Sequence, residues 1–128
     1  MFLGSTVCYS VHCLKYFRSE MQKEYKTIAN LNAVWGRNYK SFDEVPPVQR
    51  KEVENSSNLA PWLDHKVFMS RVYAERFIGA RAEAIQKHVP GAKVGMSGTQ
   101  IPGYGYDWWQ LMKHIGCIAY YGGVQRTL

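Results

Sequence analysis

Two cysteines and a histidine near the start of the chain are the first residues whose types indicate chemistry. Cys8 and Cys13 lie on either side of a short run that also contains His12. Thiolate and imidazole groups are the usual protein ligands of zinc. A closed tetrahedral zinc site needs four donors, and this run cannot complete one without donors from elsewhere. We therefore expect no bound metal and no cofactor, and we interpret the thiols as buried or idle.

The acidic side chains are the next candidates, because carboxylates serve as general acids, general bases and nucleophiles. The chain contains Glu20, Glu24, Asp43, Glu44, Glu52, Glu54, Asp64, Glu75, Glu83 and Asp107. Most of them fall on polar helix faces or in a polar loop, and Asp107 is better explained as a helix cap. None of them directly follows a predicted strand. We predict no catalytic residue within this chain.

Two helices are predicted in the first quarter of the chain, and both have capping residues. Apolar positions recur at helical spacing from about Ser10 to Tyr25, and Ser10 can cap the start of that helix. Thr27 can cap a second, short helix that ends at Trp35. Gly36 then provides the left-handed residue that commonly terminates a helix.

An aromatic run and a long loop follow these helices. Tyr39 and Phe42 occupy a segment too short and too polar to bury them alone, so they must pack on the rest of the domain or on a ligand. Pro46 and Pro47 prevent the helix from resuming. Residues 40–60 are predicted as loop, a length that is often functional, and the polar residues 49–58 are expected on the surface.

The second half of the sequence alternates between helix and strand. Residues 58–88 form the clearest predicted helix, with an expected inward stripe of Leu63, Val67, Ala74, Ile78 and Ile85. Asp64, Arg71, Glu75 and Lys87 are expected to face away from this stripe. Residues 92–98 and 115–120 are predicted strands, and Asp107 can cap a helix between them. Strands separated by a helical crossover are typically parallel, which indicates an α/β fold.

Composition sets limits on the possible functions. The net charge is +6, but the basic residues are scattered, which favours a solvated surface over a nucleic-acid stripe. Three cysteines without a disulfide framework are typical of a reducing compartment, so we expect a cytoplasmic protein. No stretch approaches the roughly 20 apolar residues of a membrane span. The segment before Lys15 lacks the features of a secretory signal.

An ordered set of short motifs resembles a known family. The first block comprises the run from Cys8 to Cys13, then Phe17-Arg18, Tyr25, Leu31-Asn32, Trp35-Gly36 and the run from Ser41 to Val45. The second comprises Trp62-Leu63-Asp64-His65, Phe68, Tyr106-Asp107-Trp108-Trp109 and Tyr120-Tyr121-Gly122-Gly123. Together they resemble family 42 glycoside hydrolases, the β-galactosidase-like (β/α)8 barrels.

The resemblance implies a partial TIM barrel. A complete barrel needs about 250 residues, and this chain has 128. The two predicted strands would be the fifth and sixth of the barrel, with the early helices as an insertion before them. We expect a helical and loop insertion over 1–60 and a helix–strand–helix–strand segment over 61–128. The family's acid/base Glu would fall before Met1 and its nucleophile Glu beyond Leu128.

The resemblance also implies where a sugar would bind. Residues at the barrel mouth would include Ser97 and Thr99 after the fifth strand and Tyr120 and Tyr121 after the sixth. Tyr39 occupies the first position of a family aromatic pair, usually Phe-Trp, whose second position is Lys40 here. Lys40 cannot stack on a sugar as Trp does. Some members also hold a structural zinc through a three-cysteine run, in which Ser10 replaces the middle cysteine.

The sequence therefore predicts a fragment of a retaining glycoside hydrolase that acts on β-linked sugars and is inactive alone. Its expected partner is a carbohydrate in the parent protein, with no nucleic acid and no membrane, and homo-oligomers are possible. One alternative is a non-catalytic carbohydrate-binding or assembly unit. Another is a small basic nucleic-acid-binding domain, which would bind heparin with a steep salt dependence.

Overall fold

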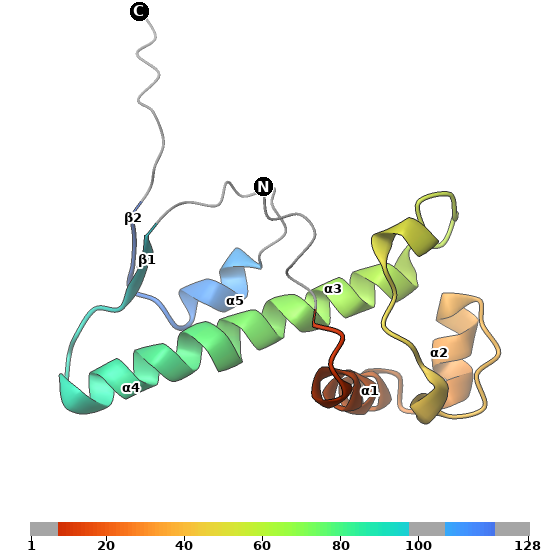
Figure 1. Ribbon diagram of the computed structural model, residues 1–128, viewed down its shortest axis with the longest axis horizontal. Coiled ribbons are helices and arrows are strands. Elements are labelled where there is room, and N and C mark those ends of the chain that lie inside the picture. Colours follow the sequence, from red (N-terminus) through yellow and green to blue (C-terminus); the bar gives the residue numbers. More distant parts are fainter. Residues whose placement is uncertain (1–7, 98–106, 120–128) are drawn as a thin grey trace, which may run out of the picture. The chain divides into compact units, whose positions relative to one another are not determined.

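The structure is a computed structural model that describes residues 8–97 and 107–119 (Figure 1). The chain divides into two compact units, residues 1–69 and 70–128, and the boundary falls within a helix. In the described part of the chain, no helix is long and apolar enough to cross a membrane.

The first unit begins with two capped helices. Helix α1 (Val11–Tyr25) starts after Ser10, whose hydroxyl accepts a hydrogen bond from the backbone N–H of Cys13 over 3.3 Å. Helix α2 (Ile28–Trp35) starts after Thr27, which caps the N–H of Asn30 in the same way. It ends at Gly36, whose φ of 63° and ψ of 44° lie in the left-handed region. Both predicted N-caps and the glycine stop are confirmed.

The predicted loop after α2 contains two short 3₁₀ helices, η1 (Phe42–Glu44) and η2 (Arg50–Glu52). Most of the polar stretch 49–58 is exposed, as expected, but Val53 within it is buried. Arg18 holds the loop against α1, because its Nε donates a hydrogen bond to the Val45 carbonyl over 3.0 Å. The loop is therefore anchored at its apolar positions while its charged residues remain in water.

Phe17 lies at the centre of the first unit's core. Its ring centroid is 4.9 Å from that of His65 and 5.2 Å from that of Phe68. The ring of Trp35 stacks near it at 6.4 Å. The largest fully buried side chains of this unit are Phe17, Leu31, Val45, Val53, Trp35, Pro61 and His65. Helix α3 (Ala60–Val72) contributes Pro61, His65 and Phe68 to this core.

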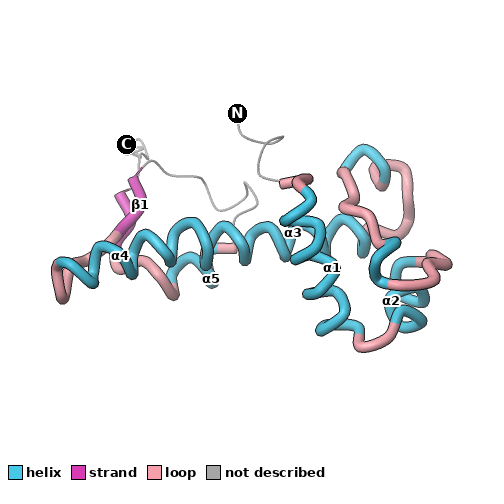
Figure 2. Tube along the Cα trace, turned by 60° about the horizontal axis from the view of Figure 1, so that its bottom comes forward, coloured by secondary structure: helices cyan, strands magenta, loops and turns pink. Residues whose placement is uncertain are grey.

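The helix continues past α3 into the second unit. A π-helical segment, η3 (Tyr73–Gly79), follows α3 in the chain and leads into α4 (Ala80–His88), and Figure 2 draws both of these segments of the second unit as helix. Strand β1 (Gly95–Ser97), helix α5 (Trp108–Met112) and strand β2 (Cys117–Ala119) follow. Asp107 caps α5 by accepting from the N–H of Gln110 over 3.1 Å, as predicted.

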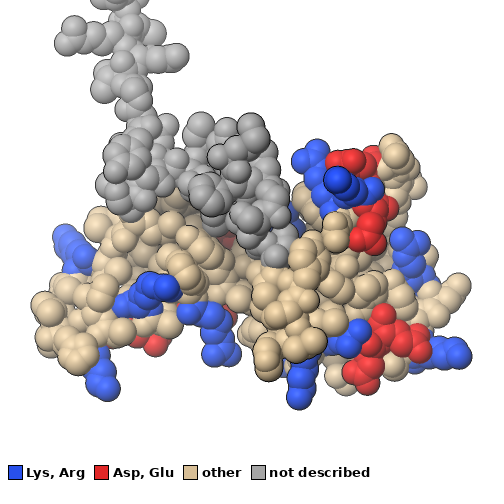
Figure 3. All heavy atoms as spheres, in the orientation of Figure 1, with Lys and Arg blue, Asp and Glu red and all other residues tan. Residues whose placement is uncertain are grey.

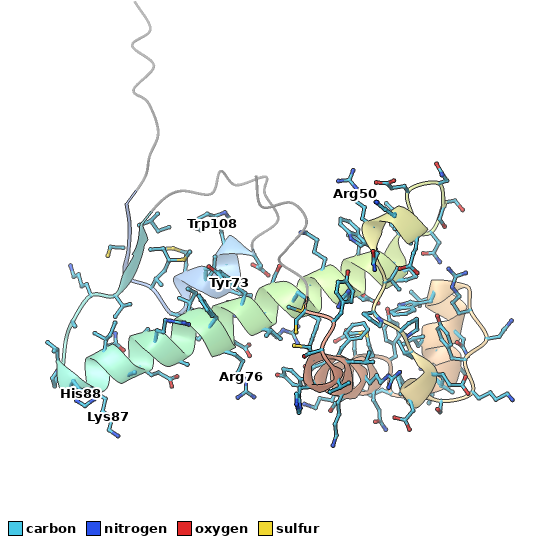
Figure 4. The ribbon with its side chains drawn as sticks, in the orientation of Figure 1. Arg50, Tyr73, Arg76, Lys87, His88 and Trp108 are labelled. Atoms are coloured by element: carbon cyan, nitrogen blue, oxygen red, sulfur yellow. The ribbon has the colours of Figure 1, made fainter. Side chains whose placement is uncertain are left out.

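The two strands form the predicted parallel pair. Gly95 lies opposite Cys117, Met96 opposite Ile118 and Ser97 opposite Ala119. Ala74, Leu111 and Ile115 form a buried cluster, against which Tyr73, Ile78, Met96 and Trp108 pack. Figure 4 labels Tyr73 and Trp108. The result is a β–α–β unit whose helical neighbour is η3, and the α/β expectation is confirmed for this unit.

The predicted inward stripe of the long helix was wrong in part. Leu63, Val67 and Ile85 are each about half exposed, whereas Ala74 is buried. In α3 the buried positions are instead Pro61, His65 and Phe68. Leu63 and Val67 both lie before η3, so the error arises within α3 itself. There His65 is buried by the contact of its Nδ1 with the Val48 carbonyl and by the packing of its ring against Phe17.

Candidate functional site

Of the predicted sugar-binding residues, Tyr39 belongs to the first unit. The side chain of Asn32 fixes its backbone. The amide of Asn32 donates to the Tyr39 carbonyl over 2.8 Å and accepts from the Tyr39 N–H over 2.9 Å. The Tyr39 ring lies edge-on to the indole of Trp35, with centroids 6.3 Å apart. Tyr39 as a whole is half-buried.

Trp35 is itself held by a carboxylate from α3. Its indole Nε1 donates to Asp64 Oδ2 over 2.7 Å, and the Tyr25 hydroxyl donates to the same oxygen over 2.5 Å. Burial, and then the hydrogen bond and charge of Asp64, raise the pKa of Tyr25 to about 12. Tyr25 therefore stays a neutral donor to this carboxylate at ordinary pH. Side chains from the ends of α1 and α2 are thus joined to the start of α3.

These contacts change the role of Asp64. The sequence predicted that Asp64 faces solvent at the start of a helix, and this was wrong, because the carboxylate is partly buried between two donors. Sequence reasoning missed the residue because its partners are 39 and 29 positions away. No local pattern in the sequence marks it as inward-facing, since its neighbour Leu63 is about half exposed. Its role here is positional: it fixes Trp35, which packs against Tyr39.

The other predicted site residues belong to the second unit. Ser97 is the last residue of β1, and its register partner Ala119 is the last residue of β2. Because the strands are parallel, their carboxyl ends lie side by side at the same end of the sheet. Thr99, Tyr120 and Tyr121 follow these ends in the sequence and lie outside the described residues. Tyr39 and Ser97 are in different units, so the structure describes each in its own surroundings.

Comparison with known proteins identifies the family. The model of glycoside hydrolase family 42, described as beta-galactosidase, matches residues 3–123. The chain belongs to glycoside hydrolase family 42. The resemblance carried by the short motifs is confirmed.

This family 42 chain has a fold similar to that of one solved structure of another protein. That protein is the polyextremophilic β-galactosidase of the Antarctic haloarchaeon Halorubrum lacusprofundi, with a TM-score of 0.73 and 22% sequence identity. The match covers 89% of this chain but 17% of that protein. The mixed helical fold with its two-stranded sheet is therefore similar to a region of a β-galactosidase with a TIM-barrel fold. A search of curated proteins gave no match.

The carboxylates of the family 42 chain lie outside β1 and β2, and the structure gives several of them other partners. Asp107 caps α5, and Asp64 is engaged by Tyr25 and Trp35. Asp43 and Glu44 are exposed on η1, and Glu44 accepts a hydrogen bond from the Lys40 backbone over 2.8 Å. Within residues 8–97 and 107–119, no three histidine, cysteine or acidic side chains group together as a metal would require.

The two thiols near the start of α1 lie around the Ser10 side chain. Cys8 Sγ is 3.1 Å from Ser10 Oγ, the same oxygen that caps the Cys13 N–H. The neighbouring Cys13 thiol, and then Ser10, lower the pKa of the Cys8 thiol. Burial is the largest cause that raises the pKa of Cys13. Both are free thiols, whereas His12 is exposed to solvent.

Proposed function

We propose that this chain forms the fifth and sixth strands, and the helical insertion before them, of a retaining glycoside hydrolase acting on β-linked sugars. The parallel register of β1 and β2 is the observation that carries the proposal. In a (β/α)8 barrel the catalytic mouth lies at the carboxyl ends of parallel strands. Ser97 is the last residue of β1, and Tyr120 and Tyr121 follow β2 in the sequence.

Substrate contacts are proposed for Tyr39, Ser97, Thr99, Tyr120 and Tyr121. An aromatic ring presents an apolar face to the C–H groups of a pyranose, and a hydroxyl exchanges hydrogen bonds with its OH groups. Tyr39 suits the first role because Asn32 fixes its backbone and Trp35 packs on its ring, while the residue as a whole is only half-buried. Lys40 beside it is exposed and cannot replace a stacking tryptophan.

Catalysis needs two carboxylates, and we propose that other segments of the parent barrel supply both. Retaining enzymes hold an acid/base and a nucleophile about 5–5.5 Å apart. Of the acidic residues, Asp107 caps α5, Asp64 accepts from Trp35, and Asp43 and Glu44 are exposed on η1. The 128-residue chain alone should therefore not hydrolyse glycosides.

Hydrolysis of 4-nitrophenyl β-galactoside and related aryl glycosides by the purified chain tests this point. We expect no turnover above a protein-free blank. Turnover that is abolished by Asp64→Asn or Asp107→Asn, but kept by the surface variant Asp43→Asn, would contradict the proposal.

A chimaera tests the substrate role. The matching region of the haloarchaeal β-galactosidase would be replaced by this segment, and its folding checked by circular dichroism. We expect Tyr39→Ala to lower kcat/KM by about 3- to 10-fold, the equivalent of roughly one aromatic contact. The neighbouring Lys40→Ala serves as the matched control and should change kcat/KM little. Equal effects of the two variants would argue against a sugar contact by Tyr39.

The distribution of charge favours a carbohydrate over a nucleic acid as the partner. On the face in Figure 3, Lys and Arg side chains are dispersed among acidic and uncharged ones within each unit. Lys23 pairs with Glu20 at 2.7 Å and Arg50 with Glu54 at 3.5 Å. A phosphate-binding surface would instead gather its cations into a patch or stripe.

A further inference from the structure

The helical segments η3 and α4 carry a stack of two aromatic rings and one guanidinium. The rings of Tyr73 and Phe77 are stacked, with centroids 5.2 Å apart and an interplanar angle of 17°. The guanidinium carbon of Arg81 lies 3.6 Å from the centroid of the Phe77 ring. Its Nη1 also donates a hydrogen bond to the Phe77 carbonyl over 2.7 Å. These two contacts hold the guanidinium in one orientation.

The stack belongs to a row of residues spaced four positions apart, which we call the Phe77 stripe: Tyr73, Phe77, Arg81, Ile85 and Val89. Phe77 and Ile85 are each 46% exposed, and Val89 is 57% exposed. The opposite flank is covered, because Ala74 of η3 is buried against Leu111 of α5. In the described part of the second unit, η3 and α4 therefore have one flank packed on α5 and another flank that is apolar and exposed.

Arg81 has no acidic neighbour in its own helix at the spacing of an ion pair. The positions three and four residues before and after it hold Ile78, Phe77, Ala84 and Ile85. A planar guanidinium held against a ring is well suited to bind a carboxylate through two N–H groups. The Phe77 stripe therefore fits a partner that offers apolar side chains and one carboxylate.

We propose that the Phe77 stripe binds the helix between the third and fourth strands of the parent barrel, and that an Asp or Glu of that helix pairs with Arg81. The inference rests on the proposed function, in which β1 and β2 are the fifth and sixth strands. The helix leading into β1 is then the fourth crossover of the ring, and α5 is the fifth. The helices of a (β/α)8 barrel form a closed outer ring, so each has two neighbours. Because α5 is one neighbour, the exposed flank faces the third crossover helix.

A second copy of this chain is a poorer occupant. Arg81 is the midpoint of the Phe77 stripe, so antiparallel pairing of two copies about that point would bring two guanidiniums together. Like charges opposed across an interface disfavour association, and the net charge of +6 adds to this repulsion. The match with the haloarchaeal β-galactosidase covers 17% of that protein, so most helices of such a barrel belong to other segments.

Photo-crosslinking in the chimaera with the haloarchaeal β-galactosidase identifies the occupant. The photoreactive residue p-benzoylphenylalanine replaces Phe77, or Ile85 in a second variant. After irradiation and digestion, mass spectrometry should find the crosslink on the helix between the third and fourth strands. The same residue at Val11, which is 75% exposed on α1, is the matched control and should not join that helix. A crosslink to a second copy, or none from either position, would overturn the proposal.

Arg81→Gln tests the carboxylate. The substitution removes the stacking on Phe77 in any protein, but it removes the ion pair only where the partner helix is present. We therefore expect a larger fall in the urea midpoint of the chimaera than in that of the 128-residue chain. Arg50→Gln, at an exposed ion pair in the first unit, is the control and should change both midpoints little. Equal falls for Arg81→Gln in the two proteins would rule out the pairing.

The activity of the chimaera separates this inference from the proposed function. A crosslink to the expected helix in a folded chimaera that has no glycosidase activity would support the Phe77 stripe and count against the proposed function. An active chimaera without the crosslink would count against the Phe77 stripe alone.

Discussion

Trp35 donates its indole N–H to the carboxylate of Asp64 across 2.7 Å, although 29 positions separate the two residues. The Tyr25 hydroxyl donates to the same carboxylate oxygen. One acidic side chain therefore satisfies donors at the ends of two different helices. Because buried or half-buried donors without a partner are costly, the carboxylate helps to fix the relative positions of these helix ends.

Replacing Asp64 with alanine should destabilise the protein through both unpaired donors. An unsatisfied buried donor costs about 1–3 kcal/mol, so we expect Asp64→Ala to lower the free energy of unfolding by at least about 2 kcal/mol. Asp43→Ala, at an exposed carboxylate on η1, is the control and should stay within about 0.5 kcal/mol of the wild type. Urea unfolding monitored by tryptophan fluorescence measures both. Equal effects of the two variants would show that the contact with Trp35 is not important for stability.

Much of the local structure follows from the sequence, because helix ends depend on neighbouring residues. Ser10, Thr27 and Asp107 cap the helices that they were predicted to cap, and Gly36 ends α2 in the left-handed conformation. The parallel pairing of β1 and β2 also follows from the order strand, helix, strand. These features need no information about distant contacts.

The face of the long helix could not be predicted, because partners far away in the sequence decide it. Pro61, His65 and Phe68 have helical spacing, but a histidine in that pattern is normally interpreted as polar surface. It is buried here because Val48 accepts its N–H and Phe17 packs against its ring. The position of Tyr39 was similarly hidden, since Asn32 and Trp35 hold it through tertiary contacts.

Burial of His65 should make stability depend on pH. The Val48 carbonyl lies 3.3 Å from Nδ1 and can only accept, so Nδ1 carries the hydrogen. Burial lowers the pKa of His65 below its ordinary value of about 6.5. The unfolded chain therefore binds a proton more readily, and the free energy of unfolding should fall as pH decreases below about 6.5. Above that pH, this contribution is fully present.

His65→Gln separates this effect from that of other titrating groups. Its amide can still donate to Val48 but does not titrate. Urea midpoints at about pH 7.5 and about pH 5.5 should differ less in the variant than in the wild type. The same difference in both proteins would mean that His65 is not the responsible group.

Stability should require glycine at position 79, because the side chain of His114 lies close to it. Its backbone is ordinary right-handed helix, with φ of −58°, so alanine is permitted conformationally. An added Cβ would, however, lie 2.8 Å from Nδ1 of His114. We expect Gly79→Ala to cost about 1–3 kcal/mol through this clash.

When His114 is replaced by alanine, Gly79→Ala should raise the free energy of unfolding instead of lowering it. In a His114→Ala background the clash disappears, and alanine in a helix interior is more stable than glycine by roughly 0.5–1 kcal/mol. A double-mutant cycle of urea unfolding free energies measures the coupling. Additive effects of the two substitutions would show that His114 does not set the requirement for glycine.

The open edges of the small sheet should make the isolated chain self-associate. In the described part of the chain, β1 and β2 pair with each other and with no further strand. Trp109 is 75% exposed and Ile118, on β2, is 37% exposed. Unpaired strand edges beside exposed apolar side chains favour pairing with another copy. We therefore expect sedimentation and thermal unfolding to depend on protein concentration.

A charge on β2 should suppress this association, as charged residues do on natural edge strands. We expect Ile118→Lys to shift the sedimentation distribution towards monomer. Val11→Lys, at a position 75% exposed on α1 in the first unit, is the matched control and should leave the distribution unchanged. A compact wild-type monomer with a sharp, concentration-independent transition would show that the edges do not drive association. In that case the chain would behave as a self-sufficient domain, and its assignment to two strands of a larger barrel would lose this support.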